Sequence, residues 1–554
     1  MNSPFIRLIQ NPVRFYHQSL VPKIRRQFPA LSYYKGLSAL EKEFVKKLSR
    51  YKVTPQAGNS KVVLMQMVED HTFCIKLTAT AHHLAKKLNA NIGLYNVESR
   101  IERPHYPTNN FLNNLLSEKQ DKIYTALGGV VLHRNTDVFP DNAIIITEFA
   151  RIKKEITSKH DVLNIHIEDI KIGDLVYDTY LRFADKSTVD IKDPFLDNIL
   201  LQSLHIYFNC KQLLQKQNIV ALVNSYTTYT KHGIMARLCL KKDIPVYTPL
   251  CGFISIVHKV IKSFPTHRNN HFTYKKMFNA LGNKEEIAEK YKELFEKRFE
   301  GVIDGATSYM KQSAFSGETN PELNNVDWKN TVMVLAHCFF DSPHIYRDLL
   351  FPDFYEWMTF TLDELRKQKG LTILVKQHPN GMPQNDGIFA GLKEKYKNDN
   401  IVFINKKTSQ LQIINSRPKA IITAYGTAAA EFSYQDFPVL TIYDNPFTAF
   451  DFTHLAKSIE EYRTMLGNIM HLPSKCDKKA IIEYYYMHNY FFLNGRDADY
   501  LSFLKFRDDS YSDNFLNAYL PLMNSAYFEM LDASISEGMA LIDWEFKICE
   551  QDYK

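Results

Sequence analysis

The chain has 554 residues, of which 45% are hydrophobic and 23% are charged, and its formal net charge is +7. This length predicts two or more domains, and the composition argues against a disordered chain. No apolar run approaches the roughly 18 residues of a transmembrane helix, so we expect a cytoplasmic protein that is soluble or peripheral on the inner face of the plasma membrane. Seven cysteines without a CxxC pair argue against a disulfide framework or a zinc site.

The positive charge is concentrated at the start of the chain. Residues 1–52 contain eleven Lys or Arg and two Glu, so the remainder is slightly acidic. We interpret residues 1–55 as a basic extension, and its interspersed aromatic residues suit an anionic membrane surface. A solvated basic helix packed on the first domain is an equal alternative, and a transit peptide is a third. Nucleic acid is not an expected partner, because the basic residues do not continue into the body of the chain.

Residues 56–320 are predicted to form a Rossmann-like domain. A strand in 61–68, a helix over 71–88 and a strand over 91–97 give a βα unit without the GxGxxG of a dinucleotide site. Further strands are expected at 143–149, 219–224 and 244–248, and helices near 110–127, 194–216 and 231–241. The charged helical segment 270–315 leads to a polar linker at 317–330.

Residues 331–512 are predicted to form a second domain of the same class. Strands at 331–340, 371–377, 400–405, 420–423 and 439–443 alternate with helices near 354–368 and 388–397. The aromatic run 483–492 has helical spacing and is typical of core. The last segment, 513–554, is expected to be helical and to cross back to the first domain. The fold class is therefore α/β, with two Rossmann-like domains facing across a cleft and added helical segments.

Polar residues follow two strands of the second domain. His378 precedes Pro379 at the end of the strand at 371–377, where an imidazole can donate to a phosphate oxygen, and Lys376 lies beside it. In open parallel sheets, ligands bind at these carboxyl ends. The sequence therefore predicts an anion site at this edge.

The next strand runs into a helix through Tyr425-Gly426-Thr427. Backbone N–H groups at a helix start, together with the Thr427 hydroxyl, can bind a phosphate, and Gly426 permits close approach. Glu431 lies one turn further on the same face and suits the diol of a ribose. An ordinary helix cap with a solvated glutamate is the alternative.

The HP pair followed about 50 residues later by GTxxxE resembles the bacterial capsule-polysaccharide glycosyltransferases of two-Rossmann (GT-B) architecture, including the Kdo transferases. The segments AHCFFDSPHIYRDLLFPDFYEWM (336–358) and GDLVYDTYLR (173–182) also carry this resemblance. It implies a CMP-sugar donor held by His378, Thr427 and Glu431. Here a lone Thr427 stands where that family has a Ser/Thr pair.

The catalytic group is expected from the first domain, because glycosyl transfer needs a carboxylate or imidazole near the anomeric centre. Asp174 and Asp178 are the carboxylate candidates, and we interpret them as flanking a short apolar turn. The alternative is that Asp178 has a structural role and forms an ion pair with Arg182. His232 is the imidazole candidate, with a polar surface histidine as its alternative.

Other residues at strand ends are candidate substrate contacts. In the first domain they are Glu69, Asp70 and His71, and in the second they are His337, Asp341, Ser342 and His344. A metal site among the latter is disfavoured by their spacing and by the absence of a DxD pair, so no metal or other cofactor is expected. Asp451 is either a donor contact or a helix cap.

The sequence therefore predicts a glycosyltransferase that moves a sugar from a nucleotide-sugar donor to a surface polysaccharide or glycolipid, and the resemblance implies Kdo or a related acidic sugar. Two alternatives remain open. One is a nucleotide-sugar 2-epimerase of the same architecture, and the other is a non-catalytic glycan-binding scaffold.

Overall fold

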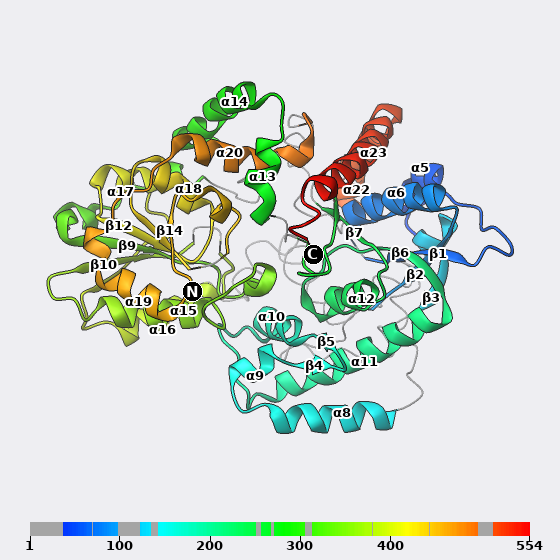
Figure 1. Ribbon diagram of the computed structural model, residues 1–554, viewed down its shortest axis with the longest axis horizontal. Coiled ribbons are helices and arrows are strands. Elements are labelled where there is room, and N and C mark those ends of the chain that lie inside the picture. The colour runs from blue at the N-terminus through cyan, green and yellow to red at the C-terminus, as the bar shows by residue number, and fades with distance from the viewer. Residues whose placement is uncertain are drawn as a thin grey trace, which may run out of the picture.

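The computed structural model describes residues 37–68, 70–97, 122–133, 142–250, 256–267, 271–304, 313–378, 381–442, 444–496 and 513–553 (Figure 1). Several predictions fall outside these residues. They concern most of the basic extension, Glu69, and the greater part of the helix expected near 110–127.

The first domain contains a six-stranded sheet in the order β3-β2-β1-β6-β7-β8. Its neighbouring strands are parallel, except that β7 and β8 are antiparallel. Numbered within the domain, the order is 3-2-1-4-5-6, as in Rossmann domains. The strands are β1 (Lys61–Gln66), β2 (Asn91–Tyr95), β3 (Val130–His133), β6 (Asn218–Val223), β7 (Val246–Leu250) and β8 (Ile256–Lys259).

The second domain repeats this topology in the order β11-β10-β9-β12-β13-β14, with all pairs parallel. The predicted class, α/β with two Rossmann-like domains of the GT-B type, is therefore confirmed. The two domains lie side by side in Figure 1. The strands are β9 (Thr331–Leu335), β10 (Thr372–Lys376), β11 (Ile401–Ile404), β12 (Ala420–Thr423), β13 (Val439–Thr441) and β14 (His454–Leu455).

Local sequence explains where the helices begin and end. The carboxylate of Asp70 caps α6 (His71–Leu88) by accepting from the backbone N–H groups of Thr72 and Phe73, and left-handed Asn89 ends it. Other helices of the first domain are α10 (Gly173–Ala184), α11 (Pro194–Lys216) and α12 (Tyr229–Lys241). Those of the second are α15 (Phe354–Leu365), α16 (Asn385–Lys395), α17 (Gln410–Ser416), α18 (Thr427–Tyr434), α19 (Ile459–Gly467) and α20 (Lys478–Asn489).

One predicted strand is wrong. Residues 143–149 belong to helix α8 (Asn142–Glu155). The run of three isoleucines suggested a buried strand, but only Ile145 is buried, and Ile146 is 63% exposed. Ile145 and Ile152 are seven residues apart and so share one helical face, which packs on the first core.

The helical connector belongs to the second domain. Helices α13 (Tyr274–Asn279) and α14 (Lys284–Glu296) pack on α20 within the hydrophobic core that includes β9 and β12. The stretch 317–330, read as a linker, also packs there, since Glu318 pairs with Thr408 and Leu323 is buried. The chain therefore changes domain near residues 261–271 rather than near 320.

The C-terminal helices pack mostly on the first domain, and the end of α23, with Trp544 and Ile548, also packs on the second core. Helix α22 (Asp513–Tyr519) packs on α5 (Ala39–Leu48), and α23 (Ser525–Ile548) packs on α6 and β8. Figure 1 shows α23 running beside α6. The aromatic run 483–492 is core, as predicted, with Tyr485 fully buried.

Candidate functional site

The carboxyl ends of β10, β9 and β12 are adjacent in the second sheet. The residues that follow them form one cluster. The His337 ring centroid lies 4.5 Å from that of Tyr425 and 6.3 Å from that of His378. The structure thus brings together two residues that the sequence analysis placed at a nucleotide site, His378 and Tyr425, with His337, a candidate substrate contact.

The start of α18 completes this edge. Gly426 is its N-cap, with φ 143° and ψ 165°, a conformation that is essentially restricted to glycine. A Cβ built on Gly426 would meet no atom within 4 Å, so open space lies in front of the helix start. Thr427, half-buried, is the first residue of α18. The first N–H groups of a helix have no partner within it and attract anions.

The two histidines of this cluster are uncharged at neutral pH. Burial, together with the nearby His337 and Lys376, lowers the pKa of His378 to about 4 against the opposing effect of the Asp341 carboxylate. Burial also lowers the pKa of His337. A neutral imidazole can still donate one hydrogen bond to a phosphate oxygen.

Lys376 and Glu431 lie beneath this edge and are 3% exposed each. The Nζ atom of Lys376 donates to the carbonyl of Thr408 at 2.5 Å, and burial lowers the pKa of this ammonium group to about 8. Glu431 forms a buried ion pair with Arg298, with 2.5 Å between Nη2 and Oε1. Sequence reasoning missed Arg298, because it lies in the segment read as a connector.

An aromatic wall borders the cluster. The ring of Tyr425 lies 5.0 Å from Tyr346 and 5.3 Å from Phe354, measured between centroids. The neighbouring Arg347 pairs with Asp444 at 3.0 Å. Apart from Tyr425, these residues were not singled out from the sequence, because the wall forms only when the segments after β9 and β12 meet.

Asp341 and Asp451 differ in their surroundings. The carboxylate of Asp341 is close enough to raise the pKa of both His337 and His378. Asp451 has left-handed geometry at the end of a short 3₁₀ helix, and its 83% exposed side chain pairs with Lys475 at 2.7 Å. Asp341 therefore faces the cluster, whereas Asp451 forms a surface ion pair.

Asp174 and Asp178 lie one turn apart on α10 and do not flank a turn, so that interpretation is corrected. Asp174 accepts two hydrogen bonds from Arg237, at 2.7 and 2.5 Å. Burial alone would raise its pKa, but the Arg237 guanidinium holds the pKa of Asp174 below its ordinary value. The carboxylate is thus fixed within the first domain.

Asp178 binds His344 of the second domain, with 2.6 Å between Oδ1 and Nδ1. The alternative interpretation, an ion pair of Asp178 with Arg182, is therefore wrong, and Arg182 instead contacts the Met382 sulfur at 2.8 Å. Beside this contact, Asp353 of the second domain accepts hydrogen bonds from Tyr177 at 2.5 Å and from the Thr188 hydroxyl at 2.6 Å.

The two remaining histidine candidates of the first domain have different settings. His71 is buried between helices, stacked on Phe515 at 6.2 Å and edge-on to Phe44 at 5.2 Å. His232, in contrast, lies near the ends of β1 and β6, with its Nδ1 atom 2.9 Å from Nε2 of Gln66. The structure therefore places His232 at the strand ends and packs His71 among α5, α6 and α22.

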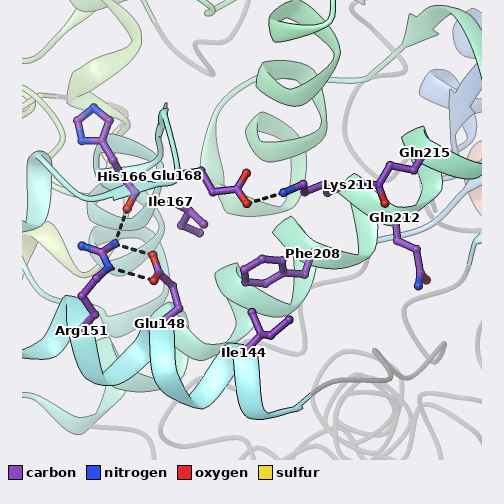
Figure 2. Close-up of a pocket in the computed structure, with 10 residues that line it drawn as sticks. All are labelled: Ile144, Glu148, Arg151, His166, Ile167, Glu168, Phe208, Lys211, Gln212 and Gln215. Atoms are coloured by element: carbon purple, nitrogen blue, oxygen red, sulfur yellow. Dashed lines mark hydrogen bonds and ion pairs between the residues drawn. The ribbon is translucent and has the colours of Figure 1, made fainter.

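A pocket of about 670 Å³ lies away from the strand ends, between α8, the hairpin β4 (His166–Ile167) and β5 (Ile170–Lys171), and α11 (Figure 2). Its charged side chains already have partners, because Arg151 pairs with Glu148 and Lys211 pairs with Glu168. None of the predicted site residues lines it.

Two negative findings apply to the described part of the chain. None of its helices combines the length and apolar character that crossing a bilayer requires. Nor does any group of three or more His, Cys, Asp or Glu side chains there have an arrangement that would hold a metal ion.

Comparison with known proteins gives likenesses of fold. No family model and no curated protein sequence matches the chain. Among solved structures, the chain is similar to KpsC of Thermosulfurimonas dismutans, a beta Kdo 2,4 transferase, at 11% identity and TM-score 0.31 over 48% of this chain and 79% of that one. It is also similar to S. aureus MnaA in complex with UDP, at 9% identity and TM-score 0.25 over 78% and 97%. The wall teichoic acid polymerase TagF matches at 8% identity and TM-score 0.19 over 92% and 99%. No residue role is taken from these likenesses.

Proposed function

We propose that the chain is a glycosyltransferase that binds a nucleotide-sugar donor at the carboxyl edge of its second sheet. The main observation behind the proposal is that His378 and His337 lie together at the same sheet edge as the open helix start at Gly426-Thr427. Neutral imidazole donors and free helix N–H groups match the phosphates of a nucleotide. The same groups would support the leaving phosphate as the glycosidic bond breaks.

The roles of individual residues follow from their exposure. We assign His378 and Thr427 to the phosphates, with Tyr425, Gly426 and His337 shaping the site and Asp341 at its border. Lys376 and Glu431 support the edge from beneath, since both are buried. We assign the acceptor to the first domain. The donor we favour is a CMP-sugar, as the resemblance to capsule enzymes implies, and the acceptor is a polysaccharide or glycolipid.

A nucleotide-sugar 2-epimerase is the competing function, and the two reactions leave different products. The protein would be incubated separately with CMP-Kdo plus a saccharide acceptor and with UDP-N-acetylglucosamine, and followed by NMR. The proposal predicts that free CMP is released as a new glycoside forms, and that UDP-N-acetylglucosamine keeps its configuration. Epimerisation of the UDP-sugar without release of the nucleotide would contradict it.

A further inference from the structure

An exposed aromatic ring lies at the carboxyl end of the first sheet. Tyr226 follows β6 and is 37% exposed. Its ring lies 5.1 Å from Phe73, 5.3 Å from His267 and 5.8 Å from His232, measured between centroids. In the part of the chain that the structure describes, no other aromatic side chain is classed as exposed.

The loop that carries Tyr226 is fixed by the buried side chain of Asn224. Its amide Nδ2 donates to the carbonyl of Tyr226 at 2.7 Å and to the carbonyl of His232 at 2.8 Å. Its Oδ1 accepts from the hydroxyl of Tyr95 at 2.7 Å. Because these hydrogen bonds fix the backbone of the loop, the loop is preorganised, and a ligand would bind without ordering it first.

The hydrogen bonds around Gln66 determine which nitrogen of His232 carries the proton. The backbone N–H of Ser225, which can only donate, lies 3.1 Å from Oε1 of Gln66. The Ser225 hydroxyl also donates to this oxygen, at 2.6 Å. His232 Nδ1 lies 2.9 Å from Nε2 of Gln66, closer than the 3.2 Å to its Oε1 and to the Ser225 hydroxyl, so the Nε2–H group donates to Nδ1. Nδ1 is thus the acceptor, and the proton of the neutral ring is on Nε2.

The His232 ring is neutral, because burial lowers its pKa well below the ordinary value. A neutral ring with its proton on Nε2 offers an uncharged hydrogen-bond donor at that atom. It has no free lone pair there with which to remove a proton from a substrate. Of the catalytic roles open to His232 as the imidazole candidate, this geometry does not suit that of a general base acting through Nε2.

We propose that Tyr226 and His232 form a saccharide subsite in which a pyranose ring packs against the exposed part of the Tyr226 side chain. A sugar ring has an apolar C–H face and hydroxyl groups at its edge. A flat aromatic ring beside a fixed N–H donor complements both, and the Nε2–H of His232 donates to a sugar hydroxyl or carboxylate. This inference rests on the proposed function, since it identifies the acceptor as a saccharide and His232 as a positioning residue.

The first test is saturation-transfer NMR on the full chain with maltotriose, N,N′-diacetylchitobiose and free Kdo as probes. At least one probe should bind the wild type, Tyr226→Ala should weaken that binding about tenfold, and Tyr226→Phe should retain it, because stacking needs the ring and not the hydroxyl. The melting temperature should be the same in all three proteins. Failure of every probe to bind, or equal binding by Tyr226→Ala, would overturn the proposal.

The second test reads the proton position directly from the ¹⁵N chemical shifts of the His232 ring. The proton should be on Nε2 in the wild type. Gln66→Glu should move it to Nδ1, since a carboxylate accepts from that nitrogen, and should weaken binding of the same probe. A wild-type ring that is protonated on Nδ1 would contradict the assignment of the proton to Nε2. Titration of each variant with CMP and UDP distinguishes the saccharide subsite from the proposed nucleotide site. A variant that loses saccharide binding but still binds the nucleotide is affected at the saccharide subsite alone.

Discussion

His344 of the second domain and Asp178 of the first are joined by a hydrogen bond of 2.6 Å between Nδ1 and Oδ1. Burial raises the pKa of Asp178 to about 6, against the opposing effect of His344. Burial alone would lower the pKa of His344, but the Asp178 carboxylate, with Asp174 and Asp353 nearby, raises it. The contact between the two domains therefore includes two groups whose pKa values are both raised in the folded protein.

This pair should make stability depend on pH. In the unfolded chain the two groups have ordinary pKa values of about 3.9 and 6.5. Both folded pKa values are higher, so the folded protein binds protons more tightly, and the stabilisation is lost as pH rises. The loss falls between about pH 4 and 6 for Asp178, and above about pH 6.5 for His344. We expect the free energy of unfolding of the wild type to fall from pH 5 to pH 8 relative to an Asp178→Asn, His344→Gln double variant.

The measurement is urea denaturation of both proteins at pH 5, 6.5 and 8. Asp451→Asn provides a matched control, because the exposed Asp451–Lys475 pair should change stability little at any of these pH values. A difference between the wild type and the double variant that stays constant across this range would contradict the prediction.

Gly426→Ala should destabilise the protein by about 1–3 kcal/mol, because the backbone there is in a region that side chains disfavour. No steric clash contributes, since a Cβ would meet open space. The control is Gly391→Ala inside α16, where a Cβ also meets no atom and alanine should stabilise by about 0.5–1 kcal/mol. Thermal denaturation of both variants checks the prediction, and equal melting temperatures would contradict it.

Glu431→Gln should destabilise the protein in the absence of any nucleotide. Among the described residues, the substitution leaves the buried Arg298 with only Asp304, 3.5 Å away, as a charged partner, and breaking a buried pair costs about 3–5 kcal/mol. Glu293→Gln removes the exposed pair with Lys297 and should change the stability little, because water screens an exposed ion pair. If Glu431→Gln melted like the wild type and lost only nucleotide binding, Glu431 would be a ribose contact and not a support.

Most of the fold was predictable because parallel strands leave simple signals. Strands β1, β9, β10 and β12 are short apolar runs, and polar residues such as His378 and Thr427 mark their ends. Helix α8 was missed because three consecutive isoleucines are as typical of a strand as of a helix, and only the packing of Ile145 and Ile152 on one face decides between them.

The partners of the predicted site residues were not predictable. Arg298 reaches Glu431 from 133 positions away in the chain, and His344 reaches Asp178 from 166 positions away. Periodicity reports neighbours along one helix, which is why Arg182 was chosen for Asp178. It carries no information about contacts between elements that are distant in sequence.

The central claim is that the strand ends of the second domain bind a nucleotide, and calorimetric titration of CMP and of UDP tests it most directly. The wild type should bind CMP in preference to UDP. His378→Ala and Thr427→Val should each bind about 10- to 100-fold more weakly, because a hydrogen bond to a charged group contributes about 1.5–3 kcal/mol. Glu293→Gln should bind like the wild type. Absence of binding to both nucleotides, or unchanged affinity in both site variants, would contradict the claim.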